Sequence, residues 1–158
     1  MVALIVPGGA NCIARSRITT VVVPPSLHGN HMGGRTVGAK KKIRHHVNPL
    51  KDAHMRKLDL PERWPENIFT HPELPLHIDV GCARGLFCLD LAASSNDVNV
   101  LGLEIRTALA EEAAADAQRL GLGNAAFLAC NANVNLDYLL ATAEPTCSLR
   151  SVSIQFPE

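Results

Sequence analysis

The sequence predicts an α/β fold in which helices cover a mostly parallel sheet. From residue 76 onward, short runs of aliphatic and β-branched residues alternate with longer segments rich in Ala and Leu. The longer segments have the length of crossover helices, and right-handed crossovers place each helix on a face of the sheet. The 158 residues are 47% hydrophobic and 19% charged, which allows one globular core. The apolar stretches fall short of the roughly 20 residues that cross a bilayer, so no membrane span is expected.

The expected elements follow one another with little interruption. The sequence predicts strands over residues 76–80, 98–104, 125–129 and 149–156, and helices over residues 85–95, 107–120 and 133–142. In the spatial order third, second, first, fourth, the last strand would lie at an open edge of the sheet. Before these elements, residues 58–75 are rich in Pro and aromatic residues, and we expect Trp64 and Phe69 to anchor this segment in the core.

Charge divides the chain into two parts. Residues 1–51 hold eight of the 15 Lys and Arg residues and no acid, whereas all 15 Asp and Glu residues follow. Residues 1–39 are also interrupted by Gly and Pro, so we expect a disordered leader without a packed element. Their composition is typical of an organellar transit peptide, which indicates a chloroplast protein, with mitochondrion or cytoplasm as alternatives. A disordered tail or a wrongly extended gene model would have the same composition.

A dense basic cluster opens the next segment, residues 40–75. Cations so close together repel one another unless solvent or phosphate surrounds them, so nucleic acid is a natural partner. A solvated surface or a continuation of the leader is the alternative. The cluster consists of Lys40, Lys41, Lys42 and Arg44. The five cysteines show no spacing that holds zinc, so no metal is expected, and their odd number argues against a disulfide framework.

Glycines and a carboxylate end the first two expected strands, where an open α/β sheet binds its ligands. Gly81 and Gly85 let the backbone bend tightly and let a ligand approach it, although a plain turn would use them equally. Glu104 ends the second strand, where a carboxylate can accept hydrogen bonds from both hydroxyls of a ribose. One helix and one strand fit between Gly85 and Glu104, and the pattern favours a nucleoside site.

Asp79 helps to distinguish two classes of nucleoside cofactor. The spacing Gly81-xxx-Gly85 differs from the GxGxxG of dinucleotide enzymes, and a carboxylate two residues earlier would repel a pyrophosphate. That carboxylate suits a cationic amino group such as that of S-adenosylmethionine. Methyl transfer is therefore favoured over hydride transfer.

Three further polar residues near this edge have more than one interpretation each. Asn131 and Asn133 follow the third strand, where an amide can bind a base edge or cap a helix. Arg106 can pair with Glu104 or face an anionic substrate, and it can also be a surface charge of the helix.

Six segments carry a resemblance to a known family. They are VNPL (47–50), WPENIF (64–69), LHIDVGCARG (76–85), LGLEIR (101–106), NAN (131–133) and IQFP (154–157). Together they resemble the tRNA (guanine-N7-)-methyltransferase family, in particular its plant and cyanobacterial branch, over about residues 40–158. The resemblance implies a Rossmann-like, class I S-adenosylmethionine-dependent methyltransferase of seven strands, represented by residues 76–158, which makes 7-methylguanine at position 46 of tRNA.

The same resemblance implies roles for individual residues. The backbone around Gly81 would contact the methionine part of the cofactor, Glu104 the ribose, and Asn131 with Ala132 the adenine. Glu158 lies where the family has the Asp of an FPDPW motif, and it is the catalytic candidate. The whole cofactor-binding set is then Asp79, Gly81, Cys82, Gly85, Glu104, Ile105, Arg106, Asn131 and Ala132.

Two departures from the family pattern bear on activity. Ala83 stands where many methyltransferases have a further glycine. The sequence ends at Glu158, before the family's PWxKxxHxKRR segment, so the resemblance predicts a C-terminally truncated enzyme with weak or no activity. A non-catalytic S-adenosylmethionine-binding or RNA-binding module and a fragment of a nicotinamide-dependent oxidoreductase are the alternative hypotheses.

Overall fold

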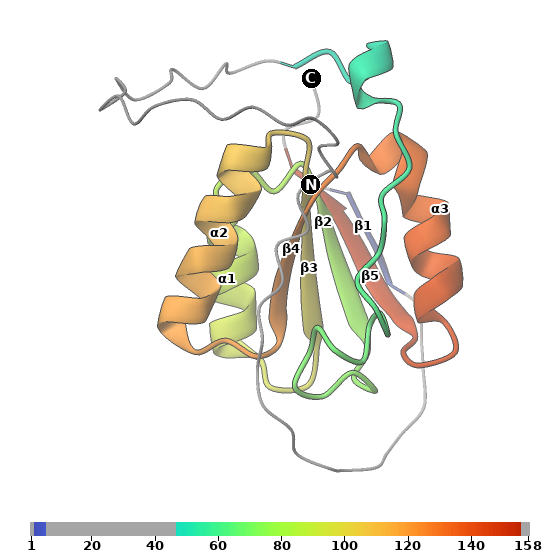
Figure 1. Cartoon of the computed structure of the whole chain (residues 1–158). Helices are drawn as coiled ribbons and strands as arrows, with labels where there is room; N and C mark the ends of the chain where they lie inside the picture. The colour runs from blue at the N-terminus through green and yellow to red at the C-terminus, as the bar shows by residue number, and fades with distance from the viewer. Residues whose placement is uncertain (1, 6–46, 156–158) are drawn as a thin grey trace.

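A sheet of five strands with helices on both faces forms the molecule (Figure 1). The computed structural model describes the backbone of residues 2–5 and all of residues 47–155. The strands are β1 (Val2–Ile5), β2 (Leu76–Val80), β3 (Asn99–Glu104), β4 (Ala125–Ala129) and β5 (Leu149–Ile154). The helices are η1 (Asp52–His54), α1 (Leu86–Ser94), α2 (Thr107–Leu120) and α3 (Ala132–Ala143). The predicted α/β class is confirmed, and so are the four strands expected after residue 75.

The strands lie in the order β1-β5-β2-β3-β4. The pairs β5–β2, β2–β3 and β3–β4 are parallel, which confirms the predicted order of the last four strands. β1 is antiparallel to β5, with Val2 opposite Ile154 and Ile5 opposite Ser151. The expectation that β5 lies at an open edge is therefore wrong, because an apolar run near the start of the chain pairs with its backbone groups.

Several predictions concern residues that the structure does not describe. The expectation that residues 1–39 hold no packed element is wrong for the four residues of β1. The rest of this leader lies outside the described residues, and so do Glu158 and the basic cluster of Lys40, Lys41, Lys42 and Arg44.

Successive side chains of each strand point to opposite faces of the sheet, so the strands contribute to two apolar layers. Ile78, Leu101 and Leu128 face α3 and the Pro-rich segment before β2. Trp64 and Phe69 are buried in that layer with their ring centroids 6.1 Å apart, as predicted. On the opposite face, side chains such as Phe127 pack against α1 and α2. Within the described residues, no helix is long and apolar enough to cross a membrane.

Candidate functional site

The carboxyl ends of β2, β3 and β4 meet at one edge of the sheet, and the predicted site residues lie there. In the parallel register Val80 lies opposite Leu103, and Glu104 lies opposite Ala129. Gly81 follows β2, Glu104 ends β3, and Asn131 follows β4 after one residue. Strands that are well separated in the sequence thus bring the three predicted contact points to the same edge.

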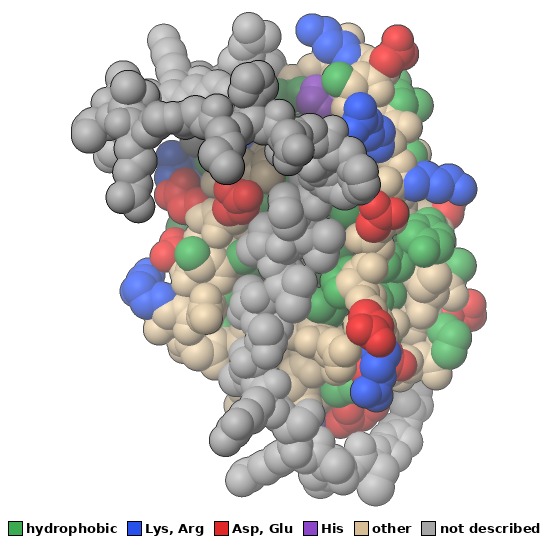
Figure 2. All heavy atoms as spheres, in the orientation of Figure 1, with side chains coloured by type: hydrophobic (Ala, Val, Ile, Leu, Met, Phe, Trp, Pro, Cys, Tyr) green, Lys and Arg blue, Asp and Glu red, His purple; other side chains and the backbone are tan. Residues whose placement is uncertain are grey.

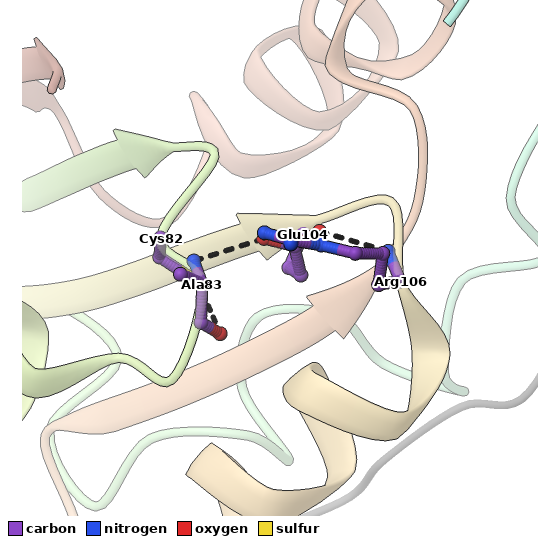
Figure 3. A network of polar contacts seen from close by, with 4 residues as sticks. All are labelled: Cys82, Ala83, Glu104 and Arg106. Carbon is purple, nitrogen blue, oxygen red and sulfur yellow. Dashed lines mark hydrogen bonds and ion pairs between the residues drawn. The ribbon is translucent and has the colours of Figure 1, made fainter. Parts of the chain in front are cut away.

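The loop between β2 and α1 is bound to the end of β3. The amides of Gly81 and Cys82 both donate to the carbonyl oxygen of Leu103, at 2.8 and 3.1 Å. The amide of Ala83 donates to Oε2 of Glu104 at 2.9 Å (Figure 3). Gly81 and Ala83 adopt left-handed backbone conformations with φ of +75° and +53°. The loop therefore has a fixed shape, with three of its amide groups directed at β3.

Gly81 and Gly85 serve different purposes. A Cβ atom on Gly81 would meet no atom within 4 Å, so its surroundings are open. A Cβ atom on Gly85 would lie 2.5 Å from Cε1 of Phe127 and 2.9 Å from Cβ of Ala113. The missing side chain of Gly85 thus serves the packing of α1, whereas only Gly81 leaves the main chain approachable for a ligand.

Glu104 is only 2% exposed, and protein donors occupy both oxygens of its carboxylate. Arg106 donates to Oε1 through its backbone amide at 2.9 Å and through Nε at 2.8 Å. Its Nη2 donates to Oε2 at 3.0 Å, beside the bond from Ala83 (Figure 3). A carboxylate offers about four acceptor positions. The predicted pairing of Arg106 with Glu104 is confirmed, and a ribose would have to take the places that the guanidinium holds.

Asp79 is directed to the protein interior. Its Oδ1 accepts a 2.6 Å hydrogen bond from the hydroxyl of Ser153, and Sγ of Cys88 lies 3.5 Å from Oδ2. The Ser153 hydroxyl also lies 3.1 Å from Nε2 of His77, whose Nδ1 lies 2.7 Å from Oγ of Ser151. In the register of β2 and β5, His77 lies opposite Ser151 and Asp79 lies opposite Ser153. The carboxylate therefore belongs to a buried cross-strand network that the sequence analysis missed.

Asn131 caps α3. Its Oδ1 accepts from the amide of Asn133 at 3.1 Å, and its Nδ2 donates to the carbonyl oxygen of Pro49 at 2.8 Å. The cap interpretation is thus confirmed for Asn131, whereas the side chain of Asn133 is exposed. Ala132 is the first residue of the helix.

The contact with Pro49 belongs to a segment that we call the strap, residues 47–59. It starts at the carboxyl edge of the sheet, includes η1 and then descends beside α3 (Figure 1). A second side-chain amide, that of Asn135, also holds the strap. Its Oδ1 accepts a hydrogen bond from the backbone N–H of Leu58 at 2.7 Å. Asn135 was not among the predicted site residues, because its partners in the strap lie more than 70 positions away in the chain.

A pocket of about 290 Å³ lies between the strap and the carboxyl edge. The loops after β3 and β4 form one wall, and the strap forms the other. Its lining residues are Ala53, His54, Arg56, Lys57, Leu58, Asp59, Ile105, Thr107, Ala129, Cys130 and Asn131. Two members of the predicted cofactor-binding set, Ile105 and Asn131, thus line the same concave space.

Buried thiols lie in the glycine loop and near it, at Cys82, Cys88 and Cys130. Burial raises the pKa of Cys130 to about 12, and a hydrogen bond with Cys82 together with burial raises the pKa of Cys88. Both thiols stay protonated near neutral pH, so neither is a thiolate nucleophile. Among residues 2–5 and 47–155, no group of three or more His, Cys, Asp or Glu side chains is arranged to hold a metal ion.

Comparison with known families decides the class of this site. The model of a family described as "Putative methyltransferase" matches residues 73–158, which contain β2 to β5. The chain belongs to this methyltransferase family. The methyltransferases that it resembles take their methyl group from S-adenosylmethionine. The match includes the glycine loop and the ends of β3 and β4 described above.

The curated relatives are methyltransferases of narrower description. The chain is 47% identical over 116 residues to a tRNA (guanine-N(7)-)-methyltransferase of Synechococcus sp. (strain CC9311), covering 73% of this chain and 48% of the relative. It is 44% identical over 117 residues to the protein of the same description from Trichormus variabilis, covering 74% of this chain and 53% of the relative. The chain thus spans about half the length of the curated relatives that it matches.

The alignment with the Synechococcus methyltransferase also reaches the strap. It covers 73% of the 158 residues, so it must begin by about residue 44. Among solved structures, a chain from the co-crystal structure of WbdD and a kinase inhibitor matches with a TM-score of 0.34 and 22% identity, over 43% of this chain and 14% of that chain.

Proposed function

We propose that this chain is the cofactor-binding half of a tRNA (guanine-N7)-methyltransferase. The proposal rests mainly on one observation, the meeting of Gly81, Glu104 and Asn131 at an edge that also bears a pocket. Membership of the methyltransferase family and the descriptions of the curated relatives support it.

The residues at this edge fit S-adenosylmethionine. Gly81 leaves the main chain open where the methionine part would lie, and the Glu104 carboxylate offers acceptors for ribose hydroxyls once Arg106 moves aside. Ile105 contributes an apolar wall, and Asn131 with Ala132 would lie against the adenine. When bound, S-adenosylmethionine supplies an electrophilic methyl group.

The protein residues would act mainly by positioning. N7 of guanine has a free lone pair in the neutral base, so it needs no deprotonation before it accepts a methyl group. Holding the two reactants in line can then provide most of the rate. In this proposal Glu158 remains the candidate for contact with the target guanine.

We propose tRNA as the substrate, with guanine 46 as the target base. The descriptions of the relatives support this substrate, and so does the surface of the strap. Lys51, Arg56 and Lys57 are exposed there, and Figure 2 shows blue side chains gathered around this part of the molecule. Phosphate contacts made by such cations would add to those of Lys40, Lys41, Lys42 and Arg44.

A chimera provides the test of this function. The 158-residue chain is joined to the C-terminal half of the Synechococcus sp. (strain CC9311) relative, and transfer of tritium from labelled S-adenosylmethionine to unmodified tRNA is measured. We expect the chimera to label a transcript with guanine at position 46 and not one with adenine there. The chain alone, in the same assay, should bind the cofactor. A chimera that binds S-adenosylmethionine and labels neither transcript would contradict the proposal.

We also propose that the leader directs the protein to the chloroplast. Its support is the absence of Asp and Glu from residues 1–39 together with Arg15 and Arg17. The mitochondrion and the cytoplasm are the alternatives. A fluorescent fusion to residues 1–39 should enter chloroplasts, and the N-terminus of the imported protein would show whether β1 is retained. Fluorescence confined to the cytosol would contradict this proposal.

A further inference from the structure

Asn135 has every polar atom of its side chain engaged, and it is completely buried in α3. Its Oδ1 accepts from the amide of Leu58 at 2.7 Å. Its Nδ2 donates to the carbonyl oxygens of Arg56 at 3.2 Å and of Asn131 at 2.9 Å. The amide thus pairs with one donor and one acceptor of the strap, as a neighbouring β-strand would.

Asn131 and Asn135 are one helical turn apart and hold the same segment. Nδ2 of Asn131 donates to Pro49, near the start of the strap, and Asn135 binds its far end. Residues four positions apart lie on the same face of a helix. One face of α3 therefore holds the strap at both ends.

The apolar contribution to this attachment is small. Leu58 is the buried side chain of the strap, at 8% exposure, whereas Leu50 and Met55 are 71% and 50% exposed. A segment with few buried apolar contacts opens readily unless polar contacts hold it. The position of the strap thus depends on its hydrogen bonds to α3.

We propose that Asn135 is a positioning residue of the cofactor pocket, acting through the strap. It touches Arg56 and Leu58, and both line the pocket. Without its amide, a backbone N–H and a carbonyl group of the strap lose their partners, and hydration of these groups favours an open strap. One wall of the pocket is then lost while the sheet stays intact. The role in cofactor binding rests on the proposed function, whereas the attachment of the strap does not.

Limited proteolysis measures the attachment directly. Arg56 and Lys57 are trypsin sites on the strap, and Arg119 at the end of α2 is a reference site remote from it. For Asn135→Ala we expect cleavage after residues 56 and 57 to become about tenfold faster with unchanged cleavage after Arg119. The matched control is Asn133→Ala, which alters an exposed amide of the same helix and should leave both rates unchanged. Equal acceleration at all sites would overturn the proposal in favour of a general structural role.

A second variant keeps the test decisive if Asn135→Ala fails to fold. Asn135→Asp has nearly the same shape, and its protonated carboxyl can still donate to the carbonyl of Arg56. Once ionised, it faces two carbonyl oxygens and repels them. The ratio of strap cleavage to Arg119 cleavage should therefore rise from pH 6 to pH 9 in this variant more than in the wild type. Equal ratios at every pH would contradict the proposal.

Cofactor titration separates this inference from the proposed function. Calorimetry with S-adenosylmethionine should show about tenfold weaker binding by Asn135→Ala than by the wild type. If Asn135→Ala opens the strap and binds the cofactor as the wild type does, Asn135 is not a positioning residue of the pocket. If the wild type binds no S-adenosylmethionine, the proposed function fails, and the proteolysis result still decides how the strap is held.

Discussion

Ala83 occupies a backbone conformation that normally selects glycine. Its φ is +53°, and a side chain in this region costs about 1–2 kcal/mol. Ala83→Gly should relieve about 1 kcal/mol of this strain. The entropy that glycine adds to the unfolded chain offsets part of this gain, and we expect a net rise in the free energy of unfolding. Urea unfolding measures the difference. Ala115→Gly, at an exposed position in the middle of α2, is the control and should lower stability by about 1 kcal/mol. If Ala83→Gly is less stable than the wild type, the backbone at Ala83 is not strained.

His77 should make stability depend on pH. Burial lowers its pKa below 6.5, and Arg150 acts in the same direction, although Asp79 opposes both. Between the folded pKa and 6.5 the unfolded chain binds more protons, so stability rises with pH and levels off above about pH 7. Urea unfolding at pH 5, 6 and 7 should show a smaller rise for His77→Gln than for the wild type. The same rise in both proteins would rule out His77 as its source.

Whether the role of a single residue could be predicted depended on how far along the chain its hydrogen-bond partners lie. Arg106 follows Glu104 by two positions, so their pairing could be weighed from sequence, and the structure shows it. Asp79 was visible as a carboxylate, but its partner Ser153 comes from a strand 74 positions later. Asn135 binds backbone groups, which every residue has, and therefore left no signal in the sequence.

The packing of α1 against the sheet depends on the absence of one side chain. Gly85 and Gly121 have the same φ of +70°, so an Ala at either position has similar backbone strain. Of these two positions, Gly85 is the one at which a Cβ would clash with Phe127, which is fully buried. Gly85→Ala should therefore lower the free energy of unfolding by about 1–3 kcal/mol more than Gly121→Ala does. Equal losses in thermal or urea unfolding would mean that the layer between α1 and Phe127 adjusts freely.

Elements of the folded body could be predicted because their patterns are local. Short runs rich in apolar residues predicted β2, β3 and β4, and the segments between these runs are long enough to form the helices α1 and α2. β1 could not be predicted in this way. Its four residues are followed by Gly and Pro, and its partner β5 lies almost 150 residues away. The open edge expected for β5 is covered by a contact with no local signal.

At the scale of the molecule, parallel strands and the strap form one concave edge. Gly81, Glu104 and Asn131 lie at the carboxyl edge of the sheet, and α3 fixes the segment that closes the pocket lined by Ile105 and Asn131. Fold class and the location of the edge followed from sequence. The strap's position did not, because it rests on hydrogen bonds between distant parts of the chain. The central claim is that this edge binds S-adenosylmethionine through Glu104.

Calorimetric titration of the 158-residue chain with S-adenosylmethionine tests that claim most directly. We predict measurable binding by the wild type and weaker binding by Glu104→Gln, because a charge-assisted contact with the ribose contributes about 1.5–3 kcal/mol. Glu111→Gln, which alters an exposed carboxylate of α2, is the matched control and should bind as the wild type does. NADH should not compete. Equal affinities of Glu104→Gln and the wild type, or tighter binding of NADH, would contradict the account.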